Sequence, residues 1–122
     1  MKFKLFAAIL LAASPLAAAQ AMDIATFITK ANALEKKGVT ALFSSDYRLL
    51  KGEVQTASNQ LRAERVAAFK AKRPMAYCPP PKSGLTPAEI LTHFRAMAPA
   101  QRARTQVKDG LRTLLARKFP CP

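Results

Sequence analysis

Apolar residues recur at three- and four-residue spacing over residues 23–37, which predicts an amphipathic helix. The apolar positions are Ile24, Phe27, Ile28, Ala31 and Leu34. Asp23 is placed to cap the first turn, and Gly38 supplies the left-handed residue that ends such a helix. Residues 39–43 then form a short apolar connection of about one turn.

A longer pattern over residues 45–72 predicts a second helix with a basic polar face. Its apolar positions have roughly heptad spacing: Tyr47, Leu50, Val54, Ala57, Leu61 and Ala68. Gly52 lowers helix propensity by about 1 kcal/mol relative to alanine, so a bend there stays open, and Pro74 ends the helix. This spacing favours packing within the core, while a homodimer through the same helix remains an alternative.

Two further helices are expected in the second half of the chain. Thr86, Pro87 and Glu89 form a capping box, and the helix that follows ends at Ala98–Pro99. The last helix is expected from Pro99 to Lys118 with these apolar positions buried: Ala100, Ala103, Val107, Leu111, Leu114 and Leu115. Because no strand pattern is present, the sequence predicts an all-α fold, a small bundle of about four helices over residues 22–122.

The first 21 residues have the pattern of a secretory signal peptide. Lys2 and Lys4 precede an apolar run of 15 residues, 5–19, and small residues permit cleavage after Ala19 or, as we favour, after Ala21. The run is shorter than the roughly 20 residues that a bilayer-spanning helix needs. We therefore expect a periplasmic protein that does not span the membrane, whose mature chain is one domain, 22–122.

The chain has two cysteines, Cys78 and Cys121. Because thiols are oxidised outside the cytoplasm, we expect them to form an intrachain disulfide; two free thiols or an intermolecular bond are the alternatives. Closing the loop between the two cysteines would stabilise the folded protein by about 4 kcal/mol in the chain-entropy model. Two cysteines and one distant histidine are too few ligands for a metal site.

Charge is distributed unevenly along the chain. Lysine and arginine number 20 against 7 acidic residues, a net charge of +13, and residues 65–122 carry twelve basic and two acidic residues. The electric field of this excess positive charge attracts an acidic protein or an anionic envelope surface. The alternative is that the basic surface is only well solvated and has no specific partner. Export argues against nucleic acid as a partner.

The sequence offers no convincing catalytic constellation. His93, the single histidine, lies one turn after Glu89, but no suitable nucleophile completes the pair, so His93 is interpreted as a partly buried packing residue. The carboxylates are scattered, and no glycine-rich phosphate loop is present. We therefore expect a protein that is not an enzyme and needs no cofactor.

Basic residues on the last expected helix are the best candidates for partner contact. Arg104, Lys108 and Arg112 are four residues apart, which would place them in one cationic ridge. Arg95, on the preceding helix, is expected nearby.

The segment 77–122 resembles the C-terminal half of the Rap/Tai family of type VI secretion immunity proteins. The similar features are Tyr77-Cys78-Pro79-Pro80, an amphipathic helix and a closing Phe119-Pro120-Cys121. Apolar family positions are matched by Leu85, Ile90, Leu91, Leu111 and Leu115. Members are small, exported, all-helical proteins that bind and block cell-wall amidase effectors delivered by rival bacteria.

The resemblance implies an exported, non-catalytic binding protein of the periplasm that inhibits an amidase effector. The alternative that the charge supports is a basic, envelope-associated protein that contacts anionic lipid, lipopolysaccharide or peptidoglycan.

Overall fold

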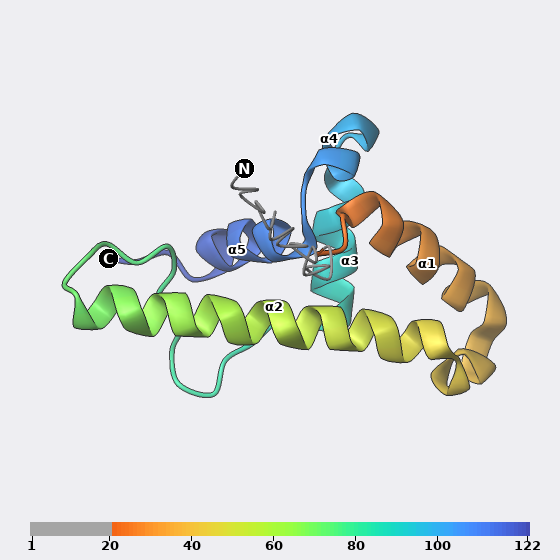
Figure 1. The fold of residues 1–122 in the computed structure, drawn as a ribbon, viewed down its shortest axis with the longest axis horizontal. Helices are drawn as coiled ribbons and strands as arrows, with labels where there is room; N and C mark the ends of the chain where they lie inside the picture. The colour runs from red at the N-terminus through yellow and green to blue at the C-terminus, as the bar shows by residue number, and fades with distance from the viewer. Residues whose placement is uncertain (1–20) are drawn as a thin grey trace, which may run out of the picture.

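The computed structural model describes residues 21–122, and the predicted signal peptide lies outside this range except for its last residue. The described chain is all-α, as predicted, with one disulfide and no strand beyond an isolated bridge. Its elements are α1 (Ile24–Lys37), the 3-10 helix η1 (Gly38–Phe43), α2 (Ser45–Lys70), α3 (Pro87–Ala96), α4 (Pro99–Arg104) and α5 (Val107–Lys118). Figure 1 shows α2 running the length of the molecule, with α1 and η1 at one end and the C-terminus near the other.

The first helix follows its apolar pattern closely. The Asp23 carboxylate accepts a hydrogen bond from the Thr26 amide (2.7 Å), which caps α1. All five apolar positions of the predicted stripe are buried. Gly38 has φ 60°, the left-handed conformation that ends the helix, and η1 follows directly.

The second helix begins at Ser45, capped by the Ser44 hydroxyl, and runs unbroken through Gly52 to Lys70. Of its predicted apolar stripe, Leu50, Ala57 and Leu61 are buried, whereas Tyr47 is exposed. The first half of α2 therefore packs its stripe only in part.

The capping box at the start of α3 is confirmed. The Thr86 hydroxyl accepts from the Glu89 amide (3.2 Å), and the Glu89 carboxylate accepts from the Thr86 amide (3.4 Å). The helix buries Phe94 completely, edge-on to Phe27 with ring centroids 5.4 Å apart. This contact joins α3 to α1.

The expected single helix from Pro99 to Lys118 was wrong, because the chain is extended at Thr105 and Gln106. There the Ile24 amide donates to the Thr105 carbonyl and the Val107 amide donates to the Met22 carbonyl, each at 2.9 Å. The N-terminal segment therefore takes backbone groups that a continuous helix would have paired internally. The described residues form five α-helices, and Ala100 and Ala103 on α4 are exposed, not buried as expected.

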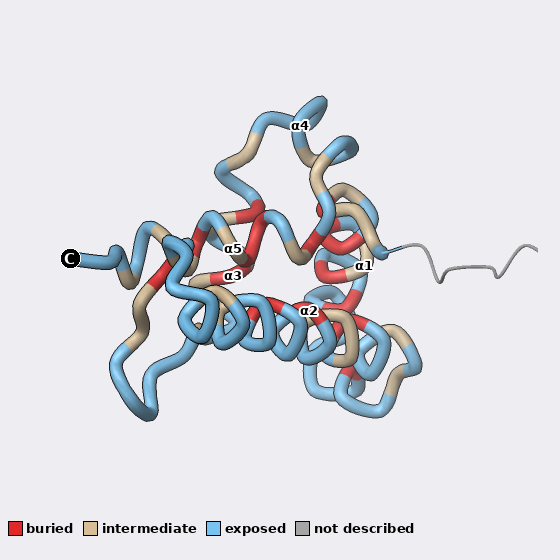
Figure 2. Tube along the Cα trace, turned by 60° about the vertical axis from the view of Figure 1, so that its left-hand side comes forward, coloured by how far each residue is buried: buried red, intermediate tan, exposed pale blue. Residues whose placement is uncertain are grey.

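The predicted disulfide is present between Cys78 and Cys121, whose Cα atoms lie 4.9 Å apart. The Cys78 amide also donates to the Phe119 carbonyl (2.8 Å), so the loop after α2 is fastened to the C-terminus. In Figure 2 the buried positions gather where α1, α3 and α5 meet α2, while α4 stands out in solvent. Among residues 21–122, none of the helices has the length and apolar character needed to cross a membrane.

Candidate functional site

The predicted cationic ridge is not continuous. Arg104 ends α4, while Lys108 and Arg112 belong to α5, so the helix break separates them. Lys108 pairs with Glu64 of α2, and Arg112 pairs with Glu64 at 3.2 Å and with Asp109 at 2.6 Å. The side chains of Lys108 and Arg112 thus connect α5 to α2.

Electrostatics support a structural role for these contacts. The hydrogen bond from Lys108 is the largest cause that lowers the pKa of Glu64, with Arg112 acting in the same direction. The hydrogen bond to Asp109 is the main cause that raises the pKa of Arg112. A partner that used these cations would have to compete with carboxylates already in place.

Arg95 and Arg104 lie apart from this pair. Arg95 donates to Glu35 (2.7 Å) and to Asn32 (2.9 Å), which ties α3 to α1. Arg104 donates from Nε to the Ala100 carbonyl (3.3 Å) and forms no salt bridge within the described chain. Three of the four residues predicted to contact a partner are therefore engaged in ion pairs among residues 21–122.

His93 and Glu89 have separate surroundings. Glu89 pairs with Lys118 (2.7 Å), and the hydrogen bond from that lysine is the main cause that lowers the pKa of Glu89. Burial is the main cause that lowers the pKa of His93, with a further contribution from the charge of Arg117. No hydrogen bond joins His93 to Glu89 within the described range, and no group of three metal-ligating side chains occurs there.

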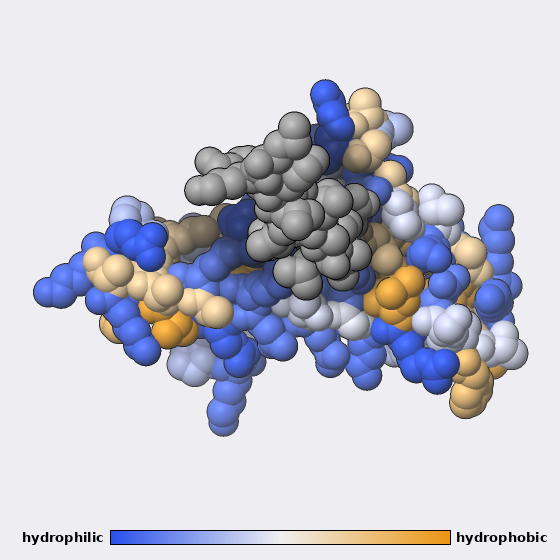
Figure 3. All heavy atoms as spheres, viewed as in Figure 1, coloured by the Kyte–Doolittle hydropathy of each residue, from blue (hydrophilic) through white to orange (hydrophobic). Residues whose placement is uncertain are grey.

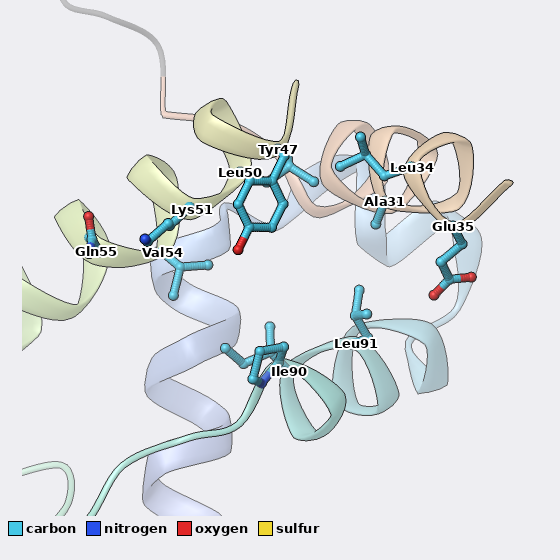
Figure 4. Close-up of a pocket in the computed structure, with 11 residues that line it drawn as sticks. Ala31, Leu34, Glu35, Tyr47, Leu50, Lys51, Val54, Gln55, Ile90 and Leu91 are labelled. Carbon is cyan, nitrogen blue, oxygen red and sulfur yellow. The ribbon is translucent and has the colours of Figure 1, made fainter. Parts of the chain in front are cut away.

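An apolar groove that the sequence did not predict lies between α1, α2 and α3 (Figure 4). Its volume is about 430 Å³. The side chains of Leu34, Tyr47, Val54, Ile90 and Leu91 approach the open space from the three helices. Its walls are apolar and polar side chains lie at the rim, an arrangement typical of sites that take a hydrophobic group.

The neighbouring helix η1 brings further apolar side chains to the surface. Phe43 is 86% exposed, Val39 is 82% exposed, and Leu42 is also exposed. Figure 3 shows apolar residues on the surface at this end of the molecule, among hydrophilic ones. Clustered apolar exposure of this kind marks interaction sites. The short apolar connection at 39–43 was the sequence signal for it, but that signal also fits a buried turn.

No protein-family model, curated protein or solved structure matches this chain. The similarity to the Rap/Tai family over residues 77–122 therefore remains a prediction that rests on the quoted residues.

Proposed function

We propose that this protein is an exported, non-catalytic binding protein of the periplasm that inhibits a cell-wall amidase effector. The observation that carries the proposal is the apolar groove together with exposed η1. The disulfide supports export, because such bonds persist in oxidising compartments. The resemblance over 77–122 supports the choice of an amidase as the partner.

A protein partner fits the groove better than a small polar ligand does. A Leu, Phe or Tyr side chain from the partner would occupy part of an apolar groove of about 430 Å³ and act as an anchor, and several such side chains would be needed to fill it. Covering the exposed η1 would remove further apolar area from water, worth about 1.5–3 kcal/mol for each large side chain that becomes fully buried. Several such side chains are needed to offset the entropy lost on association.

The test begins with capture of the partner from cells that make the protein, washed at low and high salt. The captured protein is purified, and its hydrolysis of peptidoglycan is measured with and without the full chain. We expect one partner that stays bound at high salt. We also expect it to have an amidase activity that stoichiometric amounts of this protein abolish.

Phe43→Asp with Leu42→Asp should weaken that inhibition by about 100-fold, because both apolar contacts are lost. Gln60→Glu, an exposed position on α2 away from the groove, is the control and should inhibit fully. A partner without amidase activity, or equal inhibition by the η1 variant, would overturn the proposal.

A specific observation favours the envelope-contact alternative. Near the end of α2, Phe69 is 70% exposed and Val66 is exposed beside Lys70 and Lys72. Apolar side chains next to cations suit the surface of an anionic membrane. On this alternative, the protein should sediment with vesicles containing phosphatidylglycerol and be released by salt, and Phe69→Ser should reduce sedimentation whereas the η1 variant should not.

A further inference from the structure

A second cleft lies near the disulfide, between α2 and the proline-rich loop 79–85, and its volume is about 400 Å³. Its cations are Arg62 and Arg65 from α2 and Lys82 from the loop. Its apolar walls come from the loop, from α5 and from the residues that flank these two elements: Tyr77, Pro79, Pro80, Pro81, Leu85, Leu115 and Phe119. None of the described residues that line it carries a carboxylate.

The positive charge of this cleft is not neutralised within the described chain. Arg62, Arg65 and Lys82 form no salt bridge there, because the nearby carboxylates are engaged elsewhere. Glu64, on the same helix, pairs with Lys108 and Arg112, and Glu89 pairs with Lys118. The cleft is therefore complementary to an acidic group.

Arg65 has an unused hydrogen-bonding atom. Its Nε is buried and has no hydrogen-bond partner among residues 21–122, although its guanidinium lies 5.7 Å from the centroid of the Tyr77 ring. A buried donor without a partner is unfavourable. Because this atom has almost no exposed surface, a ligand gains its hydrogen bond only if the Arg65 side chain shifts toward the cleft. Arg62 lies one turn earlier on the helix, and guanidinium groups match the planar geometry of carboxylates.

The backbone conformation of Lys82 is a further observation in favour of a binding site at this cleft. Lys82 has φ 61°, in the left-handed region that favours glycine, within a turn where the Ser83 hydroxyl donates to the Pro80 carbonyl (2.6 Å). The glycine of this loop, Gly84, does not have a positive φ. A strained residue of this kind is a reason to look for a function. Here it places a cationic side chain beside the cleft.

We propose that this cleft binds a carboxylate side chain of an acidic segment in the partner protein. This proposal rests on the proposed function only in taking the partner to be a protein. Arg62 and Arg65 bind the carboxylate, and Lys82 adds charge at the loop side. The apolar walls contact the aliphatic stem of the acidic residue or an apolar neighbour. A concave site lined by both cations and apolar groups fits such a segment better than a flat lipid surface.

The test uses the full chain, oxidised, and a synthetic peptide with blocked ends that contains glutamates and one phenylalanine. Binding is followed by ¹H–¹⁵N spectra that include the arginine Nε–H signals. We expect saturable binding with a shift of the Arg65 Nε–H signal and no such shift with the glutamine analogue of the peptide. Arg65→Gln and Arg62→Gln should each raise the Kd at least about tenfold.

Two further variants distinguish geometry from net charge. Arg65→Lys keeps the charge but loses the planar fork, so it should lose most of the affinity. Arg48→Gln, an exposed position on the same helix, removes one charge elsewhere and should change the Kd less than about twofold. Equal losses in Arg48→Gln and Arg65→Gln would overturn the site, as would equal binding of the glutamine peptide.

Lys82→Gly gives a test that does not depend on a destabilised variant. Glycine relieves the left-handed strain, so Tm should rise by about 2–5 °C while peptide affinity falls about threefold. Unchanged affinity would remove Lys82 from the proposal. If inorganic phosphate or phosphatidylglycerol vesicles bind the cleft as strongly as the acidic peptide does, the ligand is a phosphate group and the assignment of an acidic segment is wrong.

These outcomes are independent of the test of the proposed function. If the peptide fails to bind while the η1 variant still loses amidase inhibition, only the cleft assignment fails. If the peptide binds as expected but the captured partner is no amidase, the cleft stands and the immunity function fails.

Discussion

The two ends of α2 present different surfaces to solvent. At the η1 end, Tyr47 and Val54 of α2 contribute to an apolar groove. At the disulfide end, Arg62 and Arg65 contribute to a cationic cleft. Arg65 follows Tyr47 by 18 residues, about five turns, so the two side chains leave α2 on the same face, with Arg62 on the adjoining stripe. The comparison shows that the covering elements decide what kind of site one helix face forms along its length.

The covering elements are held in different ways. The groove is formed where α1 and α3 diverge from α2, and these helices are joined by the buried contact between Phe27 and Phe94. The cleft is covered by a loop that the disulfide and one backbone hydrogen bond fasten to the C-terminus. The groove therefore depends on core packing, and the cleft depends on a covalent bond.

Removing the disulfide should have the largest effect on stability, and the two ends of α2 should respond to it differently. Cys78→Ser with Cys121→Ser is expected to lower the free energy of unfolding by about 4 kcal/mol, because the unfolded chain gains the freedom of a long loop. Urea unfolding measures the loss. Hydrogen exchange should rise over 76–85 and 116–122 and change least in α1. Uniform loosening of both ends would contradict the distinction.

Chemical reduction of the wild type is the control for this double variant. It should give the same unfolding curve, because both treatments remove the same bond.

A pair of glycine variants compares the packing of α5 against α1 and α3 with an uncrowded position on α2. A Cβ on Gly110 would lie 2.5 Å from Ile24 Cδ1 and 2.8 Å from Phe94 Cε1, so Gly110→Ala should destabilise the fold by about 1–3 kcal/mol. Gly52→Ala meets nothing within 4 Å and should stabilise α2 by about 0.5–1 kcal/mol. Thermal unfolding compares the two. Equal shifts in the same direction would show that Gly110 is not closely packed.

The smallest effect is expected from the ion pairs that join α5 to α2. The folded-state pKa of Glu64 is lowered, so its contribution to stability is present above the ordinary value of 4.5 and is lost as pH falls through the folded-state pKa. Because Glu64 is half exposed, Glu64→Gln should cost only about 0.2–1 kcal/mol at pH 7. Unfolding measured from pH 7 down to pH 3 should show a smaller acid-induced loss in Glu64→Gln than in the wild type.

Salt provides the check on this interpretation, since screening weakens exposed pairs. In high salt the difference between Glu64→Gln and the wild type should shrink. A difference that persists would indicate a role for Glu64 other than ion pairing.

Local signals account for the features that the sequence predicted correctly. The Asp23 cap, the capping box at Thr86 and Glu89, and the stripe of α1 each depend on residues within a turn or two of one another. The disulfide was predictable because the chain has two cysteines and the pattern of an exported protein.

The incorrect expectations concern residues that meet partners far along the chain. The segment 105–106 contains neither glycine nor proline, and it pairs with residues 22–24 at the point where the last helix is interrupted. Lys108 and Arg112 had the spacing of a cationic face, but Glu64, more than forty residues earlier, pairs with both. Sequence spacing cannot indicate such partners without a known packing of helices.

The amino-acid pattern was enough to specify the type and approximate bounds of most helices, the caps of α1 and α3, and the cysteine pair, because these depend on short-range backbone hydrogen bonding and on residue chemistry. The groove, the cationic cleft and the break before α5 arise from packing, since their residues come from elements distant in the chain. Side chains on one helix have a fixed spacing, but whether they are buried, paired or left open depends on the other elements that approach them.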